Sequence, residues 1–264
     1  MRFSTFSLAA TLACSAFSAA VPVVAKAPAL PERGVYHLSP RGVQYNIDTF
    51  DELEEEAEAA LPDQIKASID YLANFWSANG ADWALTGGVA MQKYGMEDRI
   101  TKDADIAVSI LPLAITNAAA ADPNIQYPPT LMAASGTVSR MLLWLTDALS
   151  TVFVDINGQQ VKNDVFPDNS ELSPSLKNVV TIDGWPVVSI LSLVRSKVQR
   201  AEKKDIDDVV WFCKNRLGDV TAIASQIDYQ SRLSFASDVK ANNSDDLKFV
   251  AQGLQLDPDE VPSK

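Results

Sequence analysis

The segments Trp83-Ala-Leu-Thr-Gly-Gly-Val-Ala90 and Arg99-Ile-Thr-Lys-Asp-Ala-Asp-Ile-Ala-Val108 decide how the chain is interpreted. An apolar run enters a Thr-Gly-Gly turn, a short helical pattern follows, and a second apolar run carries two aspartates two positions apart. Alternate residues of a strand point to the same face, so we expect Asp103 and Asp105 to stand side by side. The pattern predicts a strand, a turn, a helix and a second strand that bears a carboxylate pair.

This carboxylate pair and the glycine turn together predict a binding site. Two adjacent carboxylates repel each other, and such a pair persists when a cation lies between them or when one carboxyl is protonated. A glycine turn that enters a helix exposes backbone N–H groups that suit a phosphate. Phosphate groups beside a bound cation describe a site for a metal-bound nucleotide.

The composition indicates a folded globular protein and excludes several functions. The chain has 264 residues, of which 47% are hydrophobic and 21% charged, which is enough for one large domain or two small ones. Its formal net charge is -12 and it has no long run of Lys and Arg, so we expect no bulk binding to nucleic acid. His37 is the only histidine, which excludes a His-rich metal site and a hydrolase with a histidine base.

Residues 1–25 have the pattern of a secretory signal peptide. Arg2 is the only charge, an apolar run rich in small residues spans Phe6 to Ala20, and further small residues follow. The run is too short for a convincing membrane span, and no later stretch is long and apolar enough to cross a membrane. We therefore expect an exported or secreted protein with no membrane span after leader removal. The alternative is a cytoplasmic protein with a disordered or loosely docked N-terminus.

The remaining patterns predict an α+β protein, with a mixed β-sheet flanked by helices and a helical C-terminal part. We expect an irregular arm over 26–47, an α/β core over 48–188, helices over 189–256 and an acidic, fraying tail over 257–264. The elements expected in the core are helices over 48–60, from Pro62 up to Gly80, over 88–94 and over 112–121, and strands over 83–86, 104–110, 140–145, 151–156, 159–166 and 179–182. Asn157-Gly158 predicts a hairpin turn between two of these strands.

Two further patterns lie outside the central segment. The helix expected over 48–60 carries a group of glutamates, namely Glu52, Glu54, Glu55, Glu56 and Glu58. We favour a solvated helical face, and an acidic interaction face is the alternative. Cys213 is the one cysteine outside the signal peptide, so no internal disulfide can form and we expect a buried, inert thiol.

A third carboxylate would complete the site that the pair suggests. Nucleotidyl transfer needs a positioned triphosphate and in-line oxygens, and two Mg²⁺ ions about 3.5–4 Å apart achieve this. Mg²⁺ prefers carboxylate oxygens and water, so a third carboxylate is expected on a neighbouring strand. Asp155 lies in the later strand-like run Val-Phe-Val-Asp-Ile, and we assign it as the third ligand. Its alternative role is to serve the Asn157-Gly158 turn.

Gly87-Gly88, Arg99, Thr101 and Asp103-x-Asp105 resemble the signature of the DNA polymerase beta-like nucleotidyltransferase superfamily. The chain is similar in particular to the minimal nucleotidyltransferases of bacterial abortive-infection and toxin–antitoxin systems. A second segment looks like the helical segment that follows the catalytic sheet in those proteins: Leu193, Lys197, Arg200, Lys204-Asp205 and Asp208. The resemblance covers roughly 80–215.

The resemblance implies a nucleotidyltransferase-like fold and Mg²⁺-dependent transfer of a nucleoside monophosphate from a triphosphate such as ATP to an acceptor hydroxyl, with release of pyrophosphate. Carried over by position, the residues implied to bind the nucleotide are Thr86, Gly87, Gly88, Arg99 and Lys197, and those implied to hold metal and act in catalysis are Asp103, Asp105 and Asp155. Arg99 could equally brace the loop before the strand. Lys197 could instead pair with Asp205 between helices.

Two functions remain open at this point. The first is an active nucleotidyltransferase whose partners are a nucleoside triphosphate and an acceptor that the sequence does not name. The second is a secreted binding or effector-like protein that keeps the fold without the chemistry, because nucleoside triphosphates are scarce outside cells. Magnesium-dependent nucleotide binding distinguishes the two.

Overall fold

The computed structural model describes residues 44–46, 48, 50–127, 139–145, 159–167 and 176–263. All the described residues belong to one compact unit. The predicted signal peptide, most of the predicted arm and His37 therefore lie outside the described residues. None of the described helices is long and apolar enough to cross a membrane.

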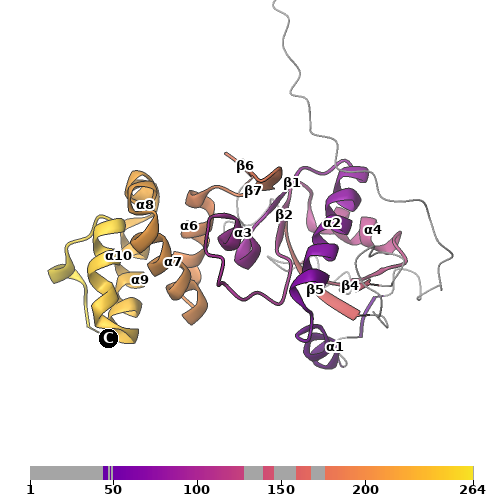
Figure 1. The fold of residues 1–264 in the computed structure, drawn as a ribbon, viewed down its shortest axis with the longest axis horizontal. Coiled ribbons are helices and arrows are strands. Elements are labelled where there is room, and N and C mark those ends of the chain that lie inside the picture. Colours follow the sequence, from indigo (N-terminus) through magenta and orange to yellow (C-terminus); the bar gives the residue numbers. More distant parts are fainter. Residues whose placement is uncertain are drawn as a thin grey trace, which may run out of the picture. The chain divides into compact units, whose positions relative to one another are not determined.

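Seven strands in the described part form one mixed sheet in the order β3-β4-β5-β2-β1-β7-β6 (Figure 1). The strands are β1 (Trp83–Leu85), β2 (Ile106–Val108), β3 (Ile125–Gln126), β4 (Ser139–Leu145), β5 (Gln159–Pro167), β6 (Val180–Ile182) and β7 (Trp185–Val187). β1 pairs with β7 and β2 pairs with β5 in parallel, and the other pairs are antiparallel. The expected α+β architecture with a mixed sheet is confirmed.

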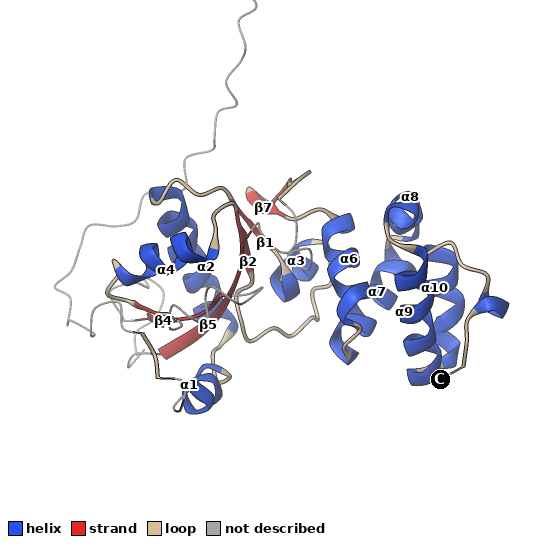
Figure 2. Ribbon diagram, turned by 180° about the vertical axis from the view of Figure 1, so that it is seen from behind, coloured by secondary structure: helices blue, strands red, loops and turns tan. Residues whose placement is uncertain are grey.

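Helices flank this sheet and make up the described C-terminal part. They are α1 (Phe50–Ala57), α2 (Pro62–Ala78), α3 (Gly87–Lys93), α4 (Pro112–Ala120), α6 (Ile190–Arg200), α7 (Lys203–Asn215), α8 (Leu217–Ile223), α9 (Tyr229–Asn242) and α10 (Leu247–Gly253). α2 and α4 lie on one side of β1 and β2, and α3 and α6 lie on the other (Figure 2). The sheet is therefore covered on both faces, as its short apolar strands require.

Local sequence explains where several helices begin. α2 and α4 start with Pro62 and Pro112, which suit the first helical position because the missing N–H has no helical partner there. The backbone N–H of Leu61 donates to Gln64 Oε1 at 2.7 Å and satisfies a further end group of α2. The side chain of Ser189 accepts a hydrogen bond from the N–H of Ser192 and caps α6.

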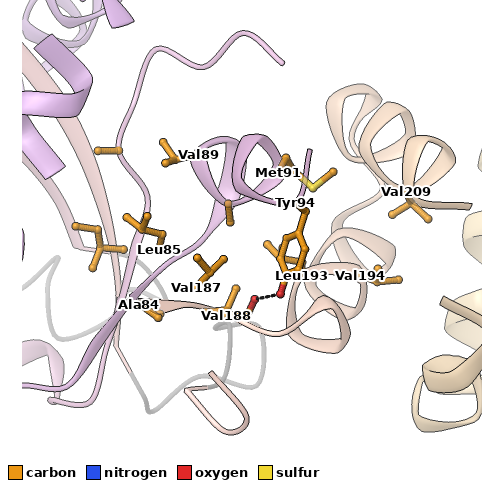
Figure 3. Packing of buried hydrophobic residues seen from close by; sticks show 14 of the residues in the cluster. Ala84, Leu85, Val89, Met91, Tyr94, Val187, Val188, Leu193, Val194 and Val209 are labelled. Carbon is orange, nitrogen blue, oxygen red and sulfur yellow. Dashed lines mark hydrogen bonds between the residues drawn. The ribbon is translucent and has the colours of Figure 1, made fainter. Parts of the chain in front are cut away.

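The core joins the first strand, the helix after it and the helix that follows β7. Leu85, Val89, Met91, Val187 and other apolar side chains fill the space between β1, α3 and α6 (Figure 3). The hydroxyl of Tyr94 donates to the carbonyl of Val188 at 2.8 Å within this packing. Burial raises the pKa of Tyr94 to about 12, because the phenolate would be poorly solvated there.

Two expectations need correction. The strand expected over 104–110 is shorter, since β2 begins at Ile106 and the aspartate pair precedes it. The tail after Leu256 does not fray: Val261 is buried, and its carbonyl accepts a hydrogen bond from Lys240 Nζ at 2.8 Å. Ser237 Oγ also donates to the carbonyl of Pro262 at 2.9 Å, so burial of Val261 and hydrogen bonds together hold a segment whose acidic and proline content suggested exposure.

The hairpin predicted from Asn157-Gly158 and the strand predicted over 151–156 lie outside the described residues. β5 pairs antiparallel with β4, from Ser139 opposite Val165 to Leu145 opposite Gln159. The expectation of a buried thiol is confirmed, because Cys213 is 1% exposed and burial raises its pKa to about 12.

Candidate functional site

A cleft of about 230 Å³ brings the two segments of the sequence signature together. The glycine turn, the loop before β2, β5, α6 and α7 contribute its walls. Its lining residues are Glu58, Gly87, Gly88, Arg99, Ile100, Thr101, Lys102, Asp103, Asp105, Lys162, Phe166, Lys197, Arg200 and Lys204. Seven of the eight residues predicted for the site are in described parts of the chain, and six of these line the cleft.

The two glycines are required because the loop before β2 lies directly on them. Gly87 has φ +56, and a Cβ atom on it would lie 1.6 Å from Asp105 Oδ2. A Cβ atom on Gly88 would lie 2.6 Å from Thr101 Oγ1. The glycine pair and the Thr-x-Asp-x-Asp segment are therefore two halves of one local structure, which explains why they occur together in the sequence.

Thr86, the residue before the two glycines, is also part of this local structure. It is 2% exposed, and its backbone N–H donates to the carbonyl of Asp105 at 3.0 Å. Thr86 does not line the cleft, unlike the two glycines after it. This hydrogen bond holds the glycine turn against the loop before β2.

Asp103 lies beside a hydroxyl and an ammonium group. Thr101 Oγ1 donates to Asp103 Oδ1 at 2.9 Å, and Lys162 Nζ lies 3.6 Å from Asp103 Oδ2. Asp103 and Lys162 also form an isolated parallel β-bridge, so the loop continues the register of β2 along β5. Sequence reasoning missed Lys162, because no local pattern connects it to the aspartate pair.

The third carboxylate has two candidates. Asp155, predicted from the sequence, lies outside the described residues. Ile106 of β2 pairs with Val165 of β5, so the residues before them, Asp105 and Asp164, lie opposite each other along the two backbones. Among the described residues, no three His, Cys, Asp or Glu side chains gather closely enough to hold a metal ion.

Lys197 belongs to a buried network of ion pairs between α6 and α7. Its Nζ lies 2.5 Å from Asp208 Oδ2 and 3.3 Å from Asp205 Oδ1, and the side chains of both aspartates are fully buried. Arg200 donates two hydrogen bonds to Asp205, at 2.7 and 3.1 Å. The pairing of Lys197 with Asp205, left open by the sequence, is present, and Asp208 is a further partner that sequence reasoning missed.

Arg99 connects this network to the loop before β2. Its Nε donates to Asp208 Oδ1 at 2.8 Å, and its guanidinium also donates to the carbonyl of Ile100. The bracing role that the sequence left open for Arg99 is therefore present. The same residue lines the cleft, so it ties the loop to α7 at the edge of the site.

The lining of the cleft is positively charged in a chain of net charge -12. Six lining residues are basic (Arg99, Lys102, Lys162, Lys197, Arg200 and Lys204) and three are acidic (Glu58, Asp103 and Asp105). Burial lowers the pKa of Arg200, but hydrogen bonding to Asp205 and the nearby carboxylates, Asp105 among them, raise it overall. Each of these six basic side chains also lies 2.5–3.4 Å from a carboxylate, so the excess of basic lining residues is balanced in part within the protein.

Comparisons with known proteins give fold similarity alone. No protein-family model and no curated protein matches the sequence. An antigenic nucleotidyltransferase-like protein from Paracoccidioides brasiliensis is 15% identical, with 72% of this chain and 94% of that chain covered and a TM-score of 0.46. A candidate nucleotidyltransferase from H. pylori is 14% identical, with 80% and 93% covered and a TM-score of 0.42. These similarities identify no substrate and no catalytic residue.

Proposed function

We propose that the protein is a Mg²⁺-dependent nucleotidyltransferase that moves a nucleoside monophosphate from a nucleoside triphosphate to an acceptor hydroxyl. One observation carries the proposal: the aspartate pair, the Gly-Gly turn and six basic side chains line the same cleft. Carboxylate oxygens suit Mg²⁺, and the basic side chains suit a triphosphate. Pyrophosphate is the leaving group of this reaction.

The carboxylates present are compatible with a divalent cation. Asp103 and Asp105 are half-buried, line the cleft and offer hard oxygen ligands. Lys162 Nζ lies 3.6 Å from Asp103 Oδ2, so a cation bound there would share this carboxylate with an ammonium group. Bound Mg²⁺ would neutralise triphosphate charge and align the attacking and leaving oxygens. Asp155 and Asp164 are the two positions that we propose for a third ligand.

The chain's own residues divide into those that contact the nucleotide and those that hold the contacts in place. Gly87 and Gly88 keep side chains out of the space beside the aspartates. Arg200 and Lys204, with side chains 39% and 57% exposed, are accessible to phosphate oxygens. Lys197 and Arg99 both bind Asp208 and so connect α6 and the loop before β2 to α7, and both residues line the cleft.

Turnover tests this proposal. The purified protein is incubated with Mg²⁺ and each nucleoside triphosphate, alone and with candidate acceptors, and pyrophosphate release is measured. We expect release that Asp103→Asn and Asp105→Asn each abolish, whereas Asp63→Asn, on the exposed first turn of α2, leaves it unchanged. Comparing Asp155→Asn with Asp164→Asn assigns the third ligand. The absence of both turnover and magnesium-dependent nucleotide binding would instead support the catalytically silent alternative.

The proposal includes export of the protein, which rests on the signal-peptide pattern of residues 1–25. N-terminal sequencing of the native protein tests it: cleavage near residue 25 is expected, and an intact N-terminus supports the cytoplasmic alternative. This result is independent of the turnover experiment.

A further inference from the structure

Lys162 occupies a position that neither the proposed chemistry nor the sequence signature explains. It lies on β5, its side chain is 16% exposed, and its Nζ is 3.6 Å from Asp103 Oδ2. The same Nζ is 3.2 Å from Glu54 Oε1 on α1. An ammonium group that contacts a metal-binding carboxylate competes with the metal, because both are cations attracted to the same oxygens. Lys162 is therefore placed to govern how readily a cation binds at Asp103.

Glu54 has a defined position because α1 is attached to the sheet. Phe50, Leu53 and Ala57 on the apolar side of α1 pack with Leu142 of β4 and with Tyr45. Glu54 Oε1 also accepts a hydrogen bond from Arg140 Nη1 at 2.8 Å. The acidic helix is thus more than a solvated face, since it holds a carboxylate within reach of a lysine in the cleft.

We infer that Lys162 is an internal counter-ion for Asp103 that a divalent cation displaces, and that Glu54 retains the displaced ammonium group. The inference rests on the proposed function, because it takes Asp103 as a metal ligand. In the cation-free protein Lys162 lies between the two carboxylates. When the cation binds, Lys162 keeps its contact with Glu54 and loses its contact with Asp103.

The two residues act on cation affinity in opposite directions. Removing the charge of Lys162 eliminates the competitor and strengthens cation binding. Removing the charge of Glu54 weakens the contact that would retain the displaced ammonium group, so Lys162 is held more tightly by Asp103 and cation binding weakens. If Glu54 acts through Lys162, the Glu54 substitution has no effect once Lys162 has been replaced. A general loss of structure cannot produce this pattern.

Mn²⁺ titration of the full-length protein, with unbound Mn²⁺ followed by electron paramagnetic resonance, tests the inference without turnover. We expect about tenfold tighter Mn²⁺ binding in Lys162→Met and about threefold weaker binding in Glu54→Gln. Lys162→Arg keeps the charge and is expected to stay within about twofold of the parent protein. Lys203→Met and Asp207→Asn are the control substitutions, because they remove the charges of an exposed ion pair on α7 that does not line the cleft, and both are expected to leave Mn²⁺ affinity unchanged.

The outcomes separate this inference from the proposed function. Mn²⁺ binding that Asp103→Asn abolishes but Lys162→Met leaves unchanged or weakens overturns the inference alone. Equal weakening by Glu54→Gln with Lys162 present or replaced also overturns it, because Glu54 then acts by charge and not through Lys162. Mn²⁺ binding that does not depend on Asp103 contradicts both. Thermal unfolding of each variant identifies proteins that have lost their structure, and Lys162→Arg and Glu54→Gln provide the test if Lys162→Met fails to fold.

Discussion

The two sides of the cleft contain carboxylates in opposite situations. Asp103 and Asp105, on the loop before β2, are half-buried and line the cleft. Asp205 and Asp208, on α7, are fully buried and bonded to lysine and arginine side chains. Asp103 has one lysine, Lys162, at 3.6 Å and faces the cleft, whereas Asp205 and Asp208 are enclosed by lysine and arginine side chains. Residue type alone does not distinguish them, but burial and partners do.

This difference predicts that replacing Asp208 lowers the stability of the fold, whereas replacing Asp103 removes cation binding. Asp208→Ala removes the carboxylate that Lys197 and Arg99 share and leaves Lys197 with Asp205 as its ion-pair partner, and we expect about 3–5 kcal/mol lower unfolding free energy. Asp103→Asn removes charge from a half-buried position, and we expect a change below about 1 kcal/mol with loss of cation binding. Urea unfolding measures both. A larger loss of stability in Asp103→Asn than in Asp208→Ala would contradict the view that Asp208 stabilises the fold and that Asp103 serves cation binding.

A second prediction concerns the contact between Gly87 and Asp105. Gly87→Ala places a Cβ atom on Asp105 Oδ2 and strains a left-handed residue, so we expect about 2–3 kcal/mol of destabilisation and loss of Mn²⁺ binding. Gly80→Ala is the matched control, because Gly80 has φ +70 but no atom within 4 Å of the added Cβ. We expect the control to lose about 1–2 kcal/mol and to keep its Mn²⁺ affinity. Unaltered Mn²⁺ binding in Gly87→Ala would show that the turn does not set the position of Asp105.

The smallest predicted effect lies away from the cleft, at the buried thiol. Burial raises the pKa of Cys213 from 9.0 to about 12, so above pH 9 the unfolded state loses this proton first and stability falls. Between pH 8 and pH 10.5 we expect the parent protein to lose about 1–2 kcal/mol more unfolding free energy than Cys213→Ala loses. Urea unfolding at the two pH values measures this difference. Equal losses in the two proteins would contradict a buried, protonated thiol.

Short-range patterns made part of the fold and site predictable. The Gly-Gly turn and the two aspartates lie in one local structure, so their spacing in the sequence was enough to predict that they lie close together. The helices that start at Pro62 and Pro112 are equally local. The expectation of a fraying tail was wrong because the side chain of Val261, near the C-terminus, is buried.

Long-range pairing made the rest unpredictable. Lys162 meets Asp103 because β5 lies parallel to β2 in one particular register, which no sequence period specifies. The position of Asp164 follows from the same register. The pairing of Arg99 with Asp208 joins a loop to a helix far along the chain. In each case the partner of a charged side chain is set by the tertiary structure, and the local sequence does not specify it.

Isothermal titration with a nucleoside triphosphate, in the presence and absence of Mg²⁺, tests the central claim most directly, because it needs no acceptor. The account predicts at least about tenfold tighter binding with Mg²⁺, and predicts that Asp103→Asn and Asp105→Asn remove this difference. Binding that is equally tight without Mg²⁺, or no binding to any nucleoside triphosphate, would contradict it.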